Sequence, residues 1–128
     1  MMGKSILIVD DEEMIRNFLS LALTRLGYAV LMARNGEDAV KLCSEENAQI
    51  DLALVDLVMP GLSGPETVGR LHRLRPGLPA VLSSGGTEGD IAKICKESGA
   101  VGYLIKPYRI NQLAEVVGTA LQKGKTDK

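Results

Sequence analysis

Residues 52–60, LALVDLVMP, contain an apolar run that ends in the carboxylate of Asp56 and continues into a proline loop. An earlier run, ILIV at 6–9, ends in the same way at Asp10 and Asp11. Short continuous apolar runs are typical of strands that are buried on both faces of a parallel sheet. Carboxylates collected at one edge of such a sheet repel one another and resist ionising. A fold retains this arrangement when a cation or a reaction compensates for it, so we expect the functional site at that edge.

Short apolar runs alternate with helical patterns along the whole chain. The predicted strands cover 5–9, 29–33, 52–55, 80–83 and 101–105. The helical patterns that follow them are an apolar stripe ending at Gly27, a segment with Asn35 as its N-cap, and segments at about 65–74, 88–98 and 110–122. Five repeats of strand and helix predict an α/β fold, with one doubly wound parallel sheet and right-handed crossovers.

The bulk properties exclude several classes of protein. We expect residues 1–122 to form a single domain and residues 123–128 to form a disordered tail. The formal net charge of −1 argues against direct binding of nucleic acid. Cys43 and Cys95 are too few for a disulfide framework and are expected to be reduced core thiols. Without a membrane-span pattern or a secretory signal, we expect a cytoplasmic protein that makes no membrane contact.

Five polar residues fall at or just beyond the carboxyl ends of the predicted strands. They are Asp10, Asp11, Asp56, Ser84 and Lys106. In open α/β sheets, ligands bind beyond these strand ends. Taken alone, an aspartate in such a place more often caps a turn or a helix. The combination of carboxylates, a hydroxyl and an ammonium group instead favours a functional site.

These motifs, in this order, resemble the receiver domain of two-component response regulators over about 4–122. The matching residues are Asp10-Asp11, Asp56, Met59-Pro60, Gly64, Ser84-Gly85, Tyr103 and Lys106-Pro107. The resemblance implies a flavodoxin-like fold with five parallel strands in the order 2-1-3-4-5. It also implies a cis peptide bond between Lys106 and Pro107, and phosphorylation of Asp56 by a histidine kinase or a phosphotransfer protein.

The chemistry of the residues suits phosphoryl transfer to a carboxylate. Asp56 would attack phosphorus in line and form an acyl phosphate. Lys106 and Ser84 would contact the phosphoryl oxygens as a charge and a hydroxyl donor. The expected Mg²⁺ ligands are the carboxylates of Asp11 and Asp56, with Asp10 acting through a water, and, by resemblance, the backbone carbonyl of Val58. The domain would catalyse its own phosphorylation and dephosphorylation with Mg²⁺ rather than act as an enzyme on another substrate.

Tyr103 has two interpretations. A strand aromatic most often packs in the core. The resemblance implies a switch, in which Ser84 moves toward the phosphoryl group on Asp56 and Tyr103 turns inward. This change would repack the surface of the fourth helix, fifth strand and fifth helix, which a downstream effector would recognise.

Other functions stay open at this point. A pseudo-receiver would use the same fold to bind proteins without being phosphorylated. A phosphohydrolase with an aspartyl intermediate usually has a second aspartate two residues after the nucleophile, where this chain has Val58. A flavin-binding protein is disfavoured because no Ser/Thr/Gly-rich phosphate loop follows the first strand. The chain could be a stand-alone regulator or one domain of a larger protein.

Overall fold

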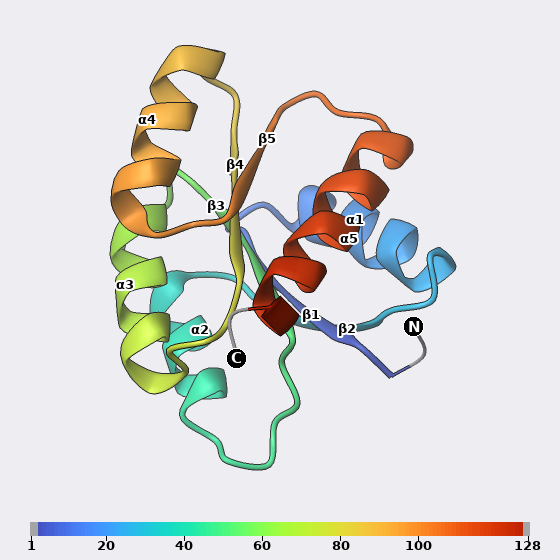
Figure 1. Cartoon of the computed structure of the whole chain (residues 1–128), viewed down its shortest axis with the longest axis vertical. Helices are drawn as coiled ribbons and strands as arrows, with labels where there is room; N and C mark the ends of the chain where they lie inside the picture. Colours follow the sequence, from blue (N-terminus) through green and yellow to red (C-terminus); the bar gives the residue numbers. More distant parts are fainter. Residues whose placement is uncertain (1–2, 127–128) are drawn as a thin grey trace.

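The computed structural model describes residues 3–126. Strands and helices alternate along the chain (Figure 1): β1 (Ser5–Val9), α1 (Glu13–Arg25), β2 (Ala29–Ala33), α2 (Gly36–Cys43), β3 (Leu52–Asp56), α3 (Gly64–Leu74), β4 (Ala80–Ser84), α4 (Glu88–Ser98), β5 (Gly102–Ile105) and α5 (Ile110–Thr126). The predicted strands agree with the observed ones to within one residue at each end. No helix within 3–126 is long and apolar enough to cross a membrane.

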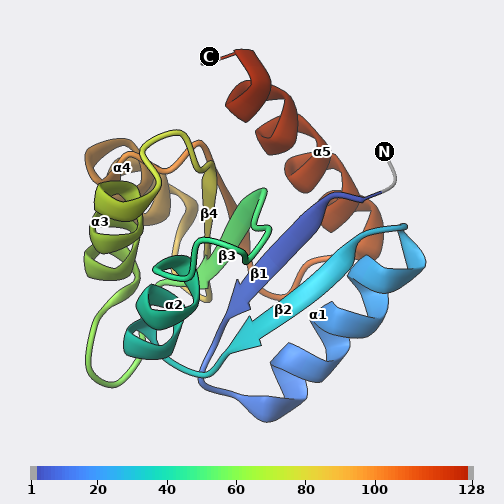
Figure 2. The same cartoon turned by 90° about the horizontal axis from the view of Figure 1, so that it is seen from below.

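The five strands form one parallel sheet in the order β2-β1-β3-β4-β5. Helices α1 and α5 cover one face of the sheet, and α2, α3 and α4 cover the other (Figures 1 and 2). The chain therefore reverses its direction of winding after β2, and the loops after β1 and β3 meet at the carboxyl edge of the sheet. This arrangement confirms the predicted doubly wound fold and its strand order.

Side chains at the helix starts satisfy backbone N–H groups that a helix leaves unpaired. Asn35 caps α2 by accepting a hydrogen bond of 2.7 Å from the backbone N–H of Asp38, as predicted. Ser63 and Glu66 form a reciprocal capping box at the start of α3. Gly99 ends α4 in the left-handed conformation, with φ of 86°, which glycine adopts without a Cβ penalty. These local signals set the lengths of the helices that surround the sheet.

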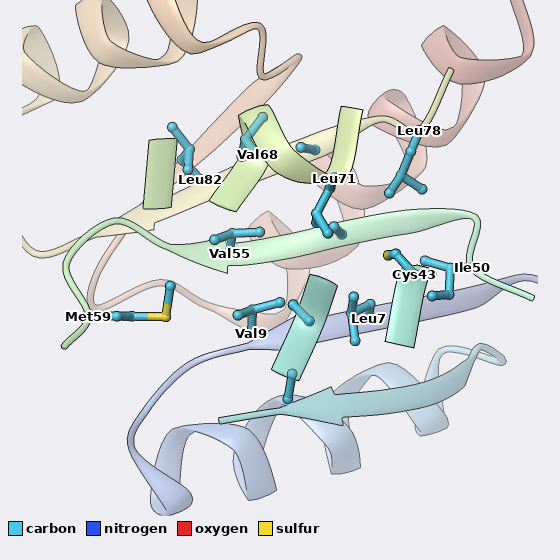
Figure 3. Close-up of a cluster of buried hydrophobic side chains, with 14 of the residues drawn as sticks. Leu7, Val9, Cys43, Ile50, Val55, Met59, Val68, Leu71, Leu78 and Leu82 are labelled. Carbon is cyan, nitrogen blue, oxygen red and sulfur yellow. The ribbon is translucent and has the colours of Figure 1, made fainter. Parts of the chain in front are cut away.

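Alternate residues of the central strands point to two separate hydrophobic clusters. One cluster lies beneath α2, α3 and α4 (Figure 3), and its labelled members are Leu7, Val9, Cys43, Ile50, Val55, Met59, Val68, Leu71, Leu78 and Leu82. The other lies beneath α1 and α5 and includes Ile6, Ile8, Leu52, Leu54, Val81, Leu104 and Leu113. Burial on both sides makes the sheet a stable platform for the polar groups at its edge.

Two details differ from the sequence-based expectations. Strand β2 is not buried on both faces, as the 47% exposure of Met32 shows. The reason is that β2 is an edge strand, which pairs only with β1. Helix α5 continues to Thr126, beyond its predicted end at 122. Once a helix has formed, each further residue that is ordered adds one backbone hydrogen bond, so the helix can continue beyond its apolar pattern. The composition of the sequence alone does not indicate this extension. Residues 127 and 128 of the predicted tail lie outside the described residues.

Candidate functional site

Three carboxylates meet at the carboxyl edge of the sheet. Asp10 and Asp11 follow β1, and Asp56 is the last residue of β3. One carboxylate oxygen from each lies within 4.8 Å of the other two. Asp10 and Asp56 are buried, with Asp56 only 9% exposed, whereas Asp11 is exposed. The structure thus brings together the acidic residues that the sequence predicted to converge.

Lys106 places an ammonium group against this acidic cluster. Its Nζ lies 3.1 Å from Oδ1 of Asp56 and 3.4 Å from Oδ2 of Asp10. The backbone N–H of Lys106 donates to the carbonyl of Ser84 at 2.7 Å, which holds the residue at the end of β5. The peptide bond between Lys106 and Pro107 is cis, as the resemblance implied. Four residues from three strand ends therefore share one charged site.

Burial and charge shift the pKa values at this site. Burial raises the pKa of Asp56, and the charges of Asp10 and Asp11 add to this, while Lys106 opposes it. For Lys106, burial acts to lower the pKa, but the carboxylates of Asp56 and Asp10 outweigh it and raise the pKa. Lys106 is therefore cationic at neutral pH. One ammonium group does not neutralise three carboxylates, so the oxygen-rich site fits a hard dication such as Mg²⁺.

Asp10 also has a local structural role. Its Oδ1 accepts a hydrogen bond of 2.9 Å from the backbone N–H of Glu12, which precedes α1. Its backbone carbonyl accepts a bond of 2.7 Å from Arg16 of α1. The turn role expected of a lone aspartate is thus present, but it uses only one carboxylate oxygen. The other oxygen remains directed toward Lys106.

Ser84 and Tyr103 lie on the opposite side of the sheet from Asp56, beside α4. The Oγ of Ser84 is buried and accepts a hydrogen bond of 2.9 Å from the backbone N–H of Gly86. The half-buried Tyr103 donates its hydroxyl hydrogen to Glu88 in the first turn of α4, at 3.2 Å. A hollow of about 730 Å³ lies between Ser84, Gly86 and α4. Both residues thus have partners near α4 rather than at the acidic cluster.

The family model of the response regulator receiver domain matches residues 6–118. This chain belongs to that family. AfsQ1, a transcriptional regulatory protein of Streptomyces coelicolor, is 33% identical over 123 residues, which cover 96% of this chain and 53% of that protein. Sporulation initiation phosphotransferase F of Bacillus subtilis is 32% identical over 117 residues, which cover 91% of this chain and 93% of that protein.

Solved structures agree with this assignment. The CheY-like response regulator receiver domain protein of Methanospirillum hungatei JF-1 has a TM-score of 0.87 and 28% identity, with 98% of each chain covered. The fold is therefore the flavodoxin-like fold of receiver domains. This receiver domain spans about half the length of the Streptomyces relative, and nearly the whole length of the Bacillus one.

The loop after β3 connects Asp56 to α3 in this receiver domain. Val58 is 76% exposed in this loop, and the expected role of its carbonyl as a metal ligand stays a prediction. Gly64 begins α3 where the loop returns to the strand end. A Cβ at Gly64 would lie 2.6 Å from the backbone oxygen of Asp56 and 2.8 Å from the Cα of Leu57. Only glycine permits this close approach, which explains its place in the motif.

Two residues near the site were missed by the sequence analysis. Ser83 is buried on β4 directly beside Asp56 in the sheet register. Tyr108 follows Lys106 and Pro107, and its phenol interacts with the charged groups of the site. The alternation of side chains along β4 was available as a signal, because it places Ser83 and Ser84 on opposite faces of the sheet. The position of Tyr108 had no comparable local signal.

Proposed function

We propose that this receiver domain is a phosphorylation-controlled switch of a two-component system, and that Asp56 is its phosphoacceptor. The observation that best supports this proposal is the buried carboxylate of Asp56. It lies between other carboxylates and the ammonium group of Lys106, which is 3.1 Å away. A nucleophilic carboxylate needs neighbouring positive charge to meet an anionic phosphoryl donor. The phosphoryl group would come from a histidine kinase or a phosphotransfer protein, and the domain would work in the cytoplasm.

Phosphoryl transfer would proceed by in-line displacement at phosphorus. A carboxylate oxygen of Asp56 forms the new bond to phosphorus, while the bond between phosphorus and the histidine nitrogen of the donor breaks. The electron pair of the broken bond stays on the imidazole. The carboxylates of Asp11 and Asp56, the Val58 carbonyl and, through a water, Asp10 would hold Mg²⁺, which would supply positive charge against the repulsion between the site and the phosphoryl donor.

Lys106 and Ser84 would hold the transferred group. The ammonium group of Lys106 already lies beside Asp56, so it can follow the new negative charge onto a phosphoryl oxygen. The hydroxyl of Ser84 would leave the backbone N–H of Gly86 and donate to another phosphoryl oxygen. The same residues serve hydrolysis of the acyl phosphate, so the domain would act catalytically on itself alone.

Signal output would pass through the surface formed by α4, β5 and α5. In the structure Tyr103 is tied outward to Glu88 on α4. Movement of Ser84 toward the phosphoryl group would leave space into which Tyr103 turns, and this would break its bond to Glu88. A downstream effector would bind whichever of the two surfaces it fits better. The charge placed on Asp56 would then bias the equilibrium between two packings.

The test is the intact mass of the protein after incubation with acetyl phosphate. We expect a gain of roughly 80 Da, one phosphoryl group, for the wild type with Mg²⁺ and none with EDTA. Asp56→Asn should gain nothing, whereas the control Asp38→Asn, which removes a carboxylate on the surface of α2, should behave like the wild type. Phosphorylation of Asp56→Asn at the wild-type rate would refute the acceptor assignment. No gain under any condition would favour the pseudo-receiver alternative.

A further inference from the structure

Ser83 carries a buried hydroxyl group that the proposed reaction does not use. The residue is 2% exposed, and its Oγ has no hydrogen-bond partner within the described part of the chain. A buried hydroxyl without a partner loses the bonds that it would make to water, which is unfavourable for folding. An alanine would fill the same position without this penalty. A hydrogen bond made by this hydroxyl in a state other than the resting one would explain why a serine stands at this position.

The sheet places Ser83 beside the acceptor. In the register, Ser83 is opposite Asp56 of β3 on one side and opposite Leu104 of β5 on the other. Partners in register project from the same face of a sheet. Lys106 lies two residues after Leu104, so the side chains of Asp56, Ser83 and Lys106 share the face covered by α1 and α5. The free hydroxyl is thus a neighbour of both reacting groups.

Tyr108 reaches the same place from the loop after β5. Its ring is half-buried and packs against the cluster beneath α1 and α5. Burial raises the pKa of the Tyr108 phenol, and the hydroxyl of Ser83 and the ammonium of Lys106 act in the opposite direction. The cluster that Tyr108 packs against contains Leu104, the register partner of Ser83 on β5, so the phenol and the Ser83 hydroxyl lie on the same face of the sheet. The two groups do not meet the geometry of a hydrogen bond.

We propose that Ser83 and Tyr108 act as a pair of positioning residues, which hold Lys106 in place while the phosphoryl group is transferred to Asp56. The inference rests on the proposed function and deepens it. Pro107 has a fixed φ and separates Lys106 from Tyr108, so the place of the phenol constrains the place of the ammonium. The Ser83 hydroxyl would hold that phenol in place through a hydrogen bond.

The unpaired hydroxyl of Ser83 would gain a hydrogen-bond partner when Lys106 moves. In the resting structure the ammonium donates to Asp56 and Asp10. Contact with a phosphoryl oxygen requires Lys106 to release Asp56, and the loop that carries it must shift with it. A serine hydroxyl both donates and accepts, so Ser83 can pair with the phenol in the shifted arrangement. The unsatisfied bond of the resting state would then be made in the reacting state, which favours transfer.

The test compares Ser83→Ala, Tyr108→Phe and the double variant for the rate of phosphorylation by acetyl phosphate, followed by intact mass. Each single change should lower the maximal rate about three- to tenfold, the range expected for loss of one hydrogen bond. The double variant should be no slower than the slower single variant, because both changes remove one interaction. The half-saturating Mg²⁺ concentration should not change, because the carboxylates are untouched. Tyr28→Phe alters a half-buried tyrosine in the same cluster away from the site, and should retain the wild-type rate.

Thermal unfolding separates positioning from a structural role. Ser83→Ala removes an unsatisfied buried hydroxyl, so it should leave the melting temperature unchanged or raise it while the rate falls. Wild-type rates in both single variants, or a rate that falls only together with stability, would overturn the pairing and leave the acceptor assignment intact. If the wild type itself takes up no phosphoryl group, the proposed function fails and the pairing fails with it.

Discussion

Asp56→Asn should make the unphosphorylated receiver domain more stable in the absence of metal. The carboxylate of Asp56 lies within 4.8 Å of two others and 3.1 Å from the ammonium of Lys106. At an effective dielectric constant of about 20, each like-charged pair at that separation costs about 3 kcal/mol and the ion pair contributes about 5 kcal/mol. Burial of the carboxylate adds a desolvation cost, which is the largest influence on its pKa. The neutral amide should therefore raise the free energy of unfolding by about 1–2 kcal/mol.

Thermal unfolding followed by circular dichroism, at pH 7 with EDTA and low salt, measures this difference. For a domain of this size we expect the melting temperature of Asp56→Asn to be about 4–8 °C higher. Glu46→Gln removes the same formal charge from an exposed position and should change the melting temperature little. Addition of Mg²⁺ should stabilise the wild type more than Asp56→Asn, because the metal binds a folded site that retains all three carboxylates.

The pH dependence follows from the raised pKa of Asp56. Because the folded domain binds this proton more tightly than the unfolded chain, the stability that it confers is present at low pH and is lost as pH rises through the folded pKa. The advantage of Asp56→Asn should therefore vanish in acid and reach its full size near neutrality. A variant that melts at or below the wild-type temperature at pH 7, or an advantage that is larger in acid, would refute the electrostatic reasoning.

Replacing Glu88 by glutamine should lower the pKa of Tyr103, which the hydrogen bond to the Glu88 carboxylate raises; absorbance titration at alkaline pH would detect this, and an unchanged midpoint would contradict the pairing. Arg75→Ala should reduce the free energy of unfolding in urea by about 2–3 kcal/mol, because the guanidinium bonds three backbone carbonyls at and after the end of α2; a loss below about 0.5 kcal/mol would count against that role. Gly64→Ala should cost about 1–3 kcal/mol, since its Cβ would stand 2.6 Å from a backbone oxygen, whereas Gly69→Ala in the same helix meets nothing and should stabilise α3.

Local sequence patterns and long-range packing determined different features of this receiver domain. Apolar runs that end in Asp10 and Asp56 indicated the strands, their burial and the edge at which the carboxylates meet, because period and burial are readable within a few residues. The resemblance added the strand order, and the sheet of the structure confirms it. The exposure of Met32 on β2 was not foreseen, since an apolar edge strand reads like a central one.

By itself, then, the sequence determined that Asp10, Asp11, Asp56 and Lys106 stand at strand ends on one edge of the sheet, because hydrophobic periodicity and strand ends are local properties. It did not indicate that Tyr108 joins them. Only the tertiary structure decided which groups pair there. Lys106 bonds both Asp56 and Asp10, and Tyr103 turns outward to Glu88. Such pairings depend on side-chain rotamers and on the packing of segments far apart in the chain, and these are settled only when the crossovers bring the strand ends together.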